Sequence, residues 1–331
     1  MVRVLAYVGR PMRRYHPPVT SPASDSSSRL DWILFALLGF MWGSSYLFIK
    51  IGVDEGLQPL TLVMLRLLFG VVVLAVVVAV AREPLPRDPR TIGHLIVMAV
   101  LNIVTPFWLI TFGEQTVDSS LASILNATVP LFTIILAALF LHDEPITVNR
   151  LVGLAVGFVG VVLLTSRNLG TAGSGVGSGE IALILSAVSY GAGNVYARRN
   201  VRGLRPMTTA LCQVGLAFII TTVLAFALED PLATTITPRA GFAVVWLGLL
   251  GSGMAYLLFF RMLGRWGSTR SSLVAYLLPI WGIVLGVIVL SEEIDGRVLL
   301  GTALVIGGVA LVNARFGARR LFGRAAPAGP A

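Results

Sequence analysis

Arg66 is the residue whose position most directly suggests chemistry, because it lies inside an otherwise apolar run, residues 60–81. A helix that begins at Pro59 would carry Arg66 about 10 Å into that run. A guanidinium can bind a carboxylate or a phosphate through two parallel hydrogen bonds. Arg66 is therefore a candidate clamp for an anionic ligand. The alternative is that its long side chain extends to polar surroundings at the end of the helix.

A second group of candidates places aromatic rings, hydroxyls and amides inside other apolar runs. Such a mixture suits a pathway that binds a small polar molecule with an apolar part. The alternative is helix packing, with the hydroxyls bonded to the backbone. This group, together with the glutamine that matches Arg66 in the repeat described below, comprises Trp42, Ser44, Ser45, Tyr46, Asn126, Tyr190, Asn194, Gln213, Tyr256, Tyr276 and Trp281.

Two prolines, Pro130 and Pro279, each lie inside a long apolar run that ends at an acid, Glu144 or Glu293. Proline removes an amide hydrogen and frees a carbonyl on the preceding turn. We expect these residues to bend their helices in a way that matters for gating; kinks that serve packing alone are the alternative. Each acid is expected to contact the arginine that follows it across a short turn, rather than to carry protons.

Charged residues at the ends of other runs have simpler explanations. Lys50 ends the first run and is expected to extend to the membrane surface, with a gate or a substrate contact as the alternative. Glu114 and Asp118 follow the third run, where a solvated loop is expected and an entrance to a pathway is the alternative.

These candidates must be positioned by an unusually apolar chain. The 331 residues are 56% hydrophobic and 12% charged, with a mean hydropathy of +0.86, whereas soluble domains have about 25% charged residues. Most apolar runs have the length of roughly 20 residues that a helix needs to cross a bilayer. The ten runs lie near residues 32–49, 60–81, 93–112, 119–141, 151–166, 181–197, 207–228, 240–260, 271–291 and 298–314. The sequence therefore predicts an all-α polytopic membrane protein with ten transmembrane helices.

The runs form an internal repeat. Pro130 and Pro279, like Glu144 and Glu293, are 149 residues apart, and Gly153 precedes Gly301 by 148. Each repeat contains five helices, so the second enters the membrane upside down, as in alternating-access transporters. We expect a first repeat at 32–168, a Gly-rich external linker at 169–179 and a second repeat at 180–314. Residues 1–31 and 315–331 are expected to be basic cytoplasmic tails, the first of them disordered.

The basic residues predict the orientation. Placing the N-terminus in the cytoplasm puts 20 basic residues of tails and loops inside and four outside, with Arg66 within a helix. Such a bias is typical of the cytoplasmic side. The sequence thus predicts a multi-pass protein of the cell (inner or plasma) membrane with both termini cytoplasmic.

The sequence argues against several classes of function. The net charge of +9 is spread over short breaks instead of being gathered on one face, which argues against nucleic acid. One cysteine, Cys212, supports neither an internal disulfide nor a thiolate metal cluster, and we expect no metal site. Three dispersed histidines and the lack of paired intramembrane acids argue against an enzyme. No phosphate-binding Gly-x-x-x-x-Gly-Lys-Ser/Thr loop is present and no soluble domain could bind nucleotide, so transport must run downhill or be coupled to an ion gradient. We expect no cofactor.

The motifs resemble those of a known family. An aromatic-glycine pair opens each repeat, Trp42–Gly43 and Tyr190–Gly191, and Gly-Ser-Gly-Met-Ala-Tyr begins at Gly251. With the duplicated proline and acid, these residues resemble the EamA family of the drug/metabolite transporter superfamily over residues 32–314. The resemblance implies transport of small metabolites or amino acids, often outward and without ATP. Small multidrug exporters of that superfamily carry a glutamate in their first helix. It is missing here, which disfavours their exchange of protons for cationic drugs.

Together these patterns predict a secondary transporter that exports small polar or amphipathic metabolites, such as amino acids, by alternating access. A passive channel is the main alternative, and a membrane-embedded enzyme is a further one. The expected partners are a small-molecule substrate, the lipid bilayer and a proton or other coupling ion. Glycines at packing spacing should make the fifth and tenth helices a scaffold, or else the face of a homodimer: Gly153, Gly157, Gly160, Gly301, Gly307 and Gly308.

Overall fold

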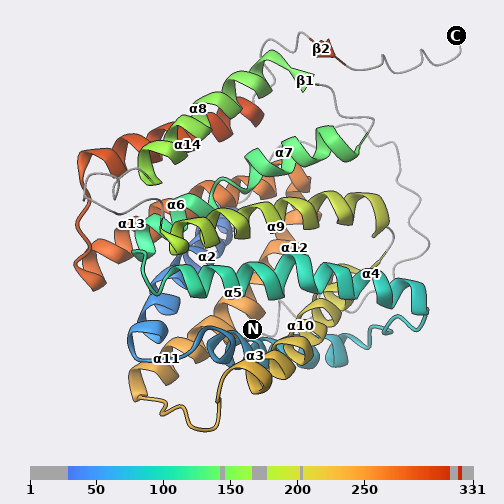
Figure 1. Ribbon diagram of the computed structural model, residues 1–331. Helices are drawn as coiled ribbons and strands as arrows, with labels where there is room; N and C mark the ends of the chain where they lie inside the picture. Colours follow the sequence, from blue (N-terminus) through green and yellow to red (C-terminus); the bar gives the residue numbers. More distant parts are fainter. Residues whose placement is uncertain (1–28, 142–145, 166–176, 202–203, 314–319, 323–331) are drawn as a thin grey trace, which may run out of the picture.

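The computed structural model describes residues 29–141, 146–165, 177–201, 204–313 and 320–322 (Figure 1). Glu144 and most of the predicted tails and linker lie outside these residues. The described chain is helical apart from two short antiparallel strands, β1 (Ile146–Thr147) and β2 (Arg320–Phe322). These strands were not predicted, because they lie outside the apolar runs and are too short to carry a hydrophobic pattern.

The first half of the chain crosses the membrane five times. Single helices make the first, second and fifth crossings: α2 (Arg29–Asp54), α3 (Pro59–Ala81) and α8 (Val148–Thr165). The third is interrupted by a π-helical segment and runs through α4 (Pro89–Ala99), η1 (Val100–Val104) and α5 (Thr105–Gly113). The fourth is broken into α6 (Ser119–Asn126) and α7 (Val129–Phe140).

The second half repeats this plan. The sixth, seventh and tenth crossings are single helices: α9 (Ser178–Asn200), α10 (Pro206–Leu228) and α14 (Gly296–Asn313). A π-helical segment interrupts the eighth, giving α11 (Pro238–Trp246), η3 (Leu247–Met254) and α12 (Ala255–Ser271). The ninth combines the 3₁₀-helical η4 (Ser272–Tyr276) with α13 (Leu277–Leu290). The interruptions therefore fall in the third and fourth crossings of each half.

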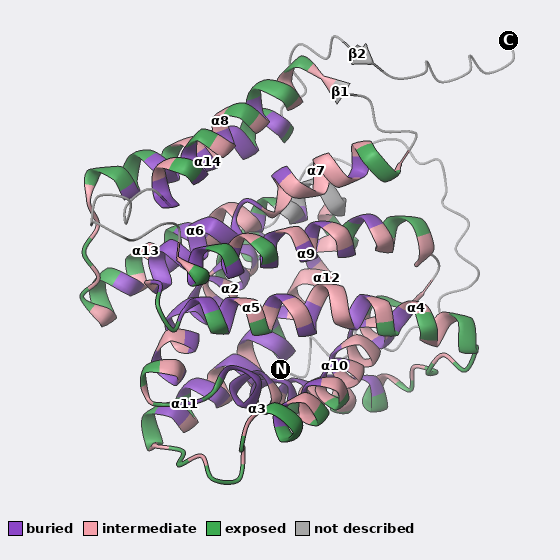
Figure 2. Ribbon diagram, in the orientation of Figure 1, coloured by how far each residue is buried: buried purple, intermediate pink, exposed green. Residues whose placement is uncertain are grey.

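The crossings have the length and surface that a bilayer requires. Nine crossings are long and apolar enough to span it, counted over the described residues. The remaining one is α9, a 23-residue helix with charged ends that lies between α5 and α7 (Figure 1). Val72, Val76 and Val80, one turn apart on α3, are exposed. Exposed positions recur along the outer helices (Figure 2), which suits contact with lipid. The predicted ten-helix membrane fold is thus confirmed.

The second and seventh crossings show the inversion of the repeat directly. We call the face at the N-terminal end of α2 the tail side, and the opposite face the loop side. On the loop side, Glu229 after α10 accepts hydrogen bonds from the amides of Leu60 and Thr61 at 2.8 and 2.7 Å. On the tail side, Glu83 after α3 accepts one from the hydroxyl of Thr208 at 2.7 Å. Each antiparallel helix therefore has its N-terminal end bonded by the acid that follows the other, where the helix dipole favours negative charge.

Glycines allow α8 and α14 to pack closely. A Cβ at Gly308 would lie 2.5 Å from the backbone nitrogen of Gly157, and one at Gly160 would lie 2.9 Å from the backbone oxygen of Gly301. These four glycines are buried. They therefore form a scaffold within one chain and are not available as the face of a homodimer.

The close approach predicts that Gly308→Ala destabilises the fold. The added methyl would overlap backbone atoms of α8, and such overpacking costs about 1–3 kcal/mol. Gly307→Ala is the matched control, because a Cβ there meets nothing within 4 Å. We expect a lower melting temperature in detergent for Gly308→Ala and an unchanged or slightly higher one for Gly307→Ala. Equal melting of the two variants would contradict the packing.

Candidate substrate-binding site

Arg66 lies in the interior of the protein and does not extend to the membrane surface. The residue is only 3% exposed. The Nε atom donates a hydrogen bond to the hydroxyl of Ser252 in η3 at 3.3 Å. The guanidinium carbon lies 4.1 Å from the centre of the Phe107 ring, at the start of α5. Arg66 is thus held beside the π-helical crossings of both halves.

No anion balances this charge among the described residues. No carboxylate oxygen there lies within 4.0 Å of the guanidinium nitrogens. The stacking on Phe107 and the bond to Ser252 use one N–H of the five that a guanidinium offers. A charge inside the membrane costs at least about 2.5 kcal/mol, so such residues usually bind another charge.

Small residues bring the η3 segment against α3 and so position Ser252. A Cβ at Gly248 would lie 2.6 Å from the backbone oxygen of Arg66, and one at Gly70 would lie 2.8 Å from the Cβ of Ser252. The π-helical turns themselves were not predicted. The glycine spacing Gly248, Gly251, Gly253 was a visible sign of close approach, although nothing in it marks a π-helix.

Two aromatic residues lie close to η3, Trp42 on α2 and Tyr256 at the start of α12. The indole nitrogen of Trp42 donates a hydrogen bond to the backbone oxygen of Gly251 at 3.2 Å, and its ring centre lies 6.3 Å from that of Tyr256. The hydroxyl of Ser45 instead bonds the backbone of its own helix, at Met41. Trp42 and Tyr256 are therefore neighbours of η3, the segment that carries Ser252. Ser45 is a neighbour too, because its hydroxyl lies 3.0 Å from the position that a Cβ of Gly251 would take.

A hydrogen-bonded chain joins three other crossings toward the loop side. The amide of Asn126 in α6 donates to the hydroxyl of Tyr46 in α2 at 2.6 Å. Its oxygen accepts a bond from Ser186 in α9 at 3.4 Å. Tyr190, one turn along α9 from Ser186, packs against the buried hydrophobic cluster that contains Tyr46. The structure thus brings Tyr46, Asn126 and Tyr190 together, and it adds Ser186, which the sequence analysis missed.

Three further candidates lie apart from this group. Asn194 is exposed, and its amide lies 3.4 Å from the hydroxyl of Thr133. The hydroxyl of Tyr276 accepts a bond from Asn313 at 3.1 Å on the tail side. Gln213, which matches Arg66 by sequence, is partly buried and makes no hydrogen bond to the described residues.

Both predicted hinge prolines follow an interruption in their crossings. Pro130 lies in the first turn of α7, directly after the break at Ala127 and Thr128. Pro279 lies in the first turn of α13, directly after the 3₁₀-helical η4.

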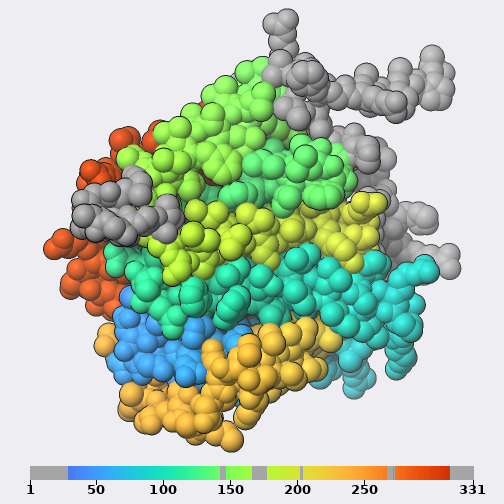
Figure 3. Space-filling model, in the orientation of Figure 1, coloured from blue at the N-terminus to red at the C-terminus, as the bar shows by residue number. Residues whose placement is uncertain are grey.

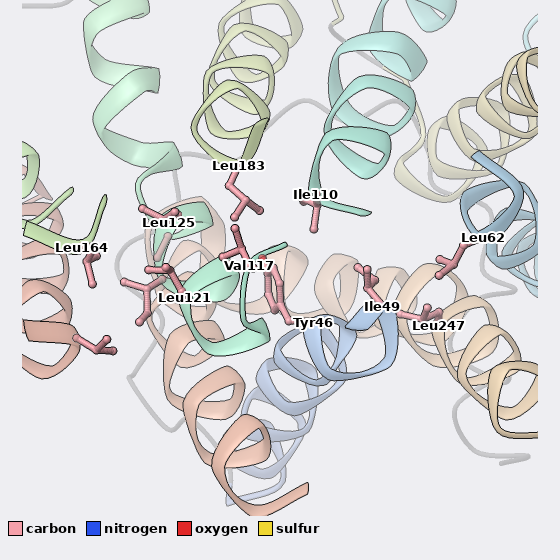
Figure 4. Close-up of a cluster of buried hydrophobic side chains, with 14 of the residues drawn as sticks. Tyr46, Ile49, Leu62, Ile110, Val117, Leu121, Leu125, Leu164, Leu183 and Leu247 are labelled. Carbon is pink, nitrogen blue, oxygen red and sulfur yellow. The ribbon is translucent and has the colours of Figure 1, made fainter. Parts of the chain in front are cut away.

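Buried apolar residues close the loop side. A single cluster there combines residues of the first half with Leu183 and Leu247 of the second (Figure 4). We call it the loop-side cluster, and its labelled members are Tyr46, Ile49, Leu62, Ile110, Val117, Leu121, Leu125, Leu164, Leu183 and Leu247. Toward the tail side, α2 packs with α12 and α7 packs with α14 in separate clusters.

Glu292 reinforces this closure and corrects an expectation. Its carboxylate accepts hydrogen bonds from the amides of Ser119 and Ser120, at 2.8 and 3.0 Å, and from both of their hydroxyls. These donors form the N-terminal end of α6, which favours an anion. The neighbouring Glu293 is exposed and forms no ion pair with Arg297, so the contact expected there was wrong.

A cavity of about 420 Å³ lies elsewhere. On α9 it is lined by Ala192, Val195, Tyr196 and Arg199, which share one face of the helix at 3.6 residues per turn. Tyr190 and Asn194 lie on the opposite face. The cavity therefore lies at the surface between α7 and the third crossing and does not belong to the Arg66 site. On this surface α9 forms a visible stripe (Figure 3).

Comparison with known proteins agrees with this architecture. A model of the EamA-like transporter family matches residues 30–166 and 177–314. The chain belongs to the EamA-like transporter family. It is similar to the uncharacterized transporter YoaV of Bacillus subtilis, with 23% identity over 85% of this chain and 96% of the relative. A solved crystal structure shares the fold, with a TM-score of 0.61 and 20% identity over 86% of this chain and 96% of that one.

Two Escherichia coli relatives carry more informative names. The uncharacterized inner membrane transporter YedA is 29% identical over 85% of this chain and 89% of its own length. A protein named probable amino-acid metabolite efflux pump is 27% identical over 85% of this chain and 94% of its own. As a member of the EamA-like transporter family, the chain is a multi-pass membrane transporter and not an enzyme.

Proposed function

We propose that this EamA-like protein exports small metabolites that carry a carboxylate, amino acids among them, without ATP. The observation that carries the proposal is the buried Arg66 guanidinium, which has no carboxylate partner among the described residues. A substrate carboxylate would supply the missing charge through paired hydrogen bonds. The rings of Phe107, Trp42 and Tyr256 would contact the apolar part of the substrate. The printed name of the efflux-pump relative supports the same class of substrate.

We propose that transport proceeds by alternating access between the two halves. The closed loop-side cluster and the separate tail-side clusters support a state that opens toward the tail side. Opening of the loop side would separate Glu292 from the N-terminal end of α6 and flex the fourth and ninth crossings next to Pro130 and Pro279. A passive channel is the second candidate, and it predicts flux that does not saturate with substrate.

We propose that the tail side faces the cytoplasm of a cell that holds this protein in its inner or plasma membrane. The support is the bias of arginines in the loops on that side and the name of the inner membrane relative. Proton or other ion coupling and a homodimer are compatible with this proposal but do not follow from it.

The anion clamp predicts a transport defect in Arg66→Gln, which copies the glutamine at the matching position of the second repeat. Hydrogen bonds to charged groups contribute about 1.5–3 kcal/mol, so the rate at low substrate concentration should fall roughly 10- to 100-fold. The measurement is counterflow of labelled amino acids in proteoliposomes. Arg239→Gln is the control, because Arg239 is an exposed loop-side arginine paired with Glu55. Equal rates for an anionic substrate in both variants would contradict the clamp, and non-saturating flux would favour the channel.

The orientation predicts that a cysteine introduced on the loop side is labelled from outside the cell. Leu232→Cys is suitable, because Leu232 is 84% exposed in the segment between α10 and α11. In a Cys212→Ser background, a membrane-impermeant maleimide should label this cysteine in intact cells. Labelling that requires permeabilised cells would reverse the proposed orientation.

A further inference from the structure

Glu114 ends the third crossing at a place where a solvated loop was expected, yet it is completely buried. Its exposed fraction is 0%, and it directly follows α5 on the loop side. Both carboxyl oxygens are buried and have no hydrogen-bond partner among the described residues. A buried ionised carboxylate without partners is strongly disfavoured, so the group is stable here only as the neutral acid.

The nearest lysine does not hold Glu114 in its ionised form. The ammonium of Lys50 donates to the backbone oxygen of Glu114 at 2.9 Å and pairs with the carboxylate of Asp54 at 3.2 Å. No basic group of the described residues lies within 4.0 Å of the Glu114 carboxyl oxygens. The positive charge of Lys50 is therefore already balanced by Asp54.

Other charged and titratable groups around Glu114 act in both directions. Burial raises the pKa of Glu114 well above its usual value; Lys50 and then Arg66 lower it, and Glu292 and then Asp54 raise it. Burial is the largest of these effects. The remaining acids on elements that pack nearby are Asp118 in the same loop and Glu180 in the first turn of α9, and the hydroxyl of Tyr46 lies on α2.

The geometry points to Glu114 as a proton-binding site whose protonation holds the loop side closed. Ile110 and Val117 of the loop-side cluster flank Glu114 in the sequence, and the amide of Glu114 donates to the backbone oxygen of Ile110 at 2.9 Å. Opening of that cluster would therefore admit water to the carboxyl group. Release of the proton would then accompany opening. The inference rests on the alternating access of the proposed function, but it does not depend on the identity of the substrate.

The sign of the pH dependence follows from the two environments. In the closed state the carboxyl is neutral and buried, whereas in an open state it would titrate near the usual glutamate pKa of about 4.3. Below that pH both states hold the proton, and closure is not penalised. As pH rises from there toward the raised pKa of the closed state, the ratio of open to closed molecules grows by up to tenfold per pH unit. Above the raised pKa the ratio becomes constant.

A cysteine accessibility measurement tests this inference without any substrate. Ala122→Cys, in a Cys212→Ser background, places a small reporter in the loop-side cluster, where Ala122 is 0% exposed. The labelling rate by an impermeant maleimide is measured between about pH 5 and 8 and divided by the rate of the exposed Leu232→Cys reporter, which removes the titration of the thiol itself. With Glu114 present, the normalised rate should rise with pH. With Glu114→Gln, which imitates the neutral acid, it should stay low and flat.

Two further variants complete the test. Asp230→Asn removes an exposed loop-side acid and should keep the wild-type slope. Glu114→Asp retains a titratable acid and should also keep a slope, which covers the case that Glu114→Gln does not fold. A flat wild-type profile, or a slope that persists in Glu114→Gln, would overturn the proton site. Loss of amino-acid transport in Arg66→Gln with an unchanged pH slope would support both proposals. Unchanged transport in Arg66→Gln, with a slope that disappears in Glu114→Gln, would contradict the anion clamp alone.

Discussion

The structure depends on how it accommodates one positive charge inside a bilayer. Arg66 is buried between the two halves, and among the described residues its surroundings supply an aromatic face and one hydroxyl but no carboxylate within 4.0 Å. Burying an arginine without an anion is costly, because little water remains to solvate it. The π-helical turns and the glycines of η3 bring Ser252 to the guanidinium, and its other donors are the ones that we propose bind a substrate carboxylate. A protein selected for stability alone could replace Arg66 by leucine, so the charge indicates a function.

The inverted repeat surrounds this charge with matching parts. The third and fourth crossings of each half are interrupted, and the acids that follow α3 and α10 bond the opposite helix. The symmetry is broken at the site, because the position that matches Arg66 in the second repeat is an uncharged glutamine, Gln213. The first half therefore provides the charge, and the second half provides Ser252 and the glycines that pack against α3 beside it. The loop-side cluster and Glu292 close one end, and Glu114 provides the group through which pH can act on that closure.

Much of the fold could be predicted because hydrophobic length and charge bias are local properties of the sequence. Ten crossings and their inversion followed from apolar runs, an odd count per repeat and the spacing of Pro130 and Pro279. The site was harder, because burial depends on neighbours distant in the chain. Glu114 resembles a loop residue in the sequence and is buried only in the folded protein. Glu292 could not be distinguished from Glu293 until the structure showed that it bonds the N-terminal end of α6. Phe107 and Ser252 carry no pattern that would link them to Arg66.

A binding site built around Arg66 should require a carboxylate on the substrate. The most direct measurement compares the purified protein's thermal stabilisation by a panel of L-amino acids with that by the corresponding amino-acid amides, which differ only in the carboxylate. At least one amino acid should raise the melting temperature in a concentration-dependent way, and its amide should bind at least about tenfold more weakly. An amide that stabilises the protein as well as its parent acid would contradict the role assigned to Arg66.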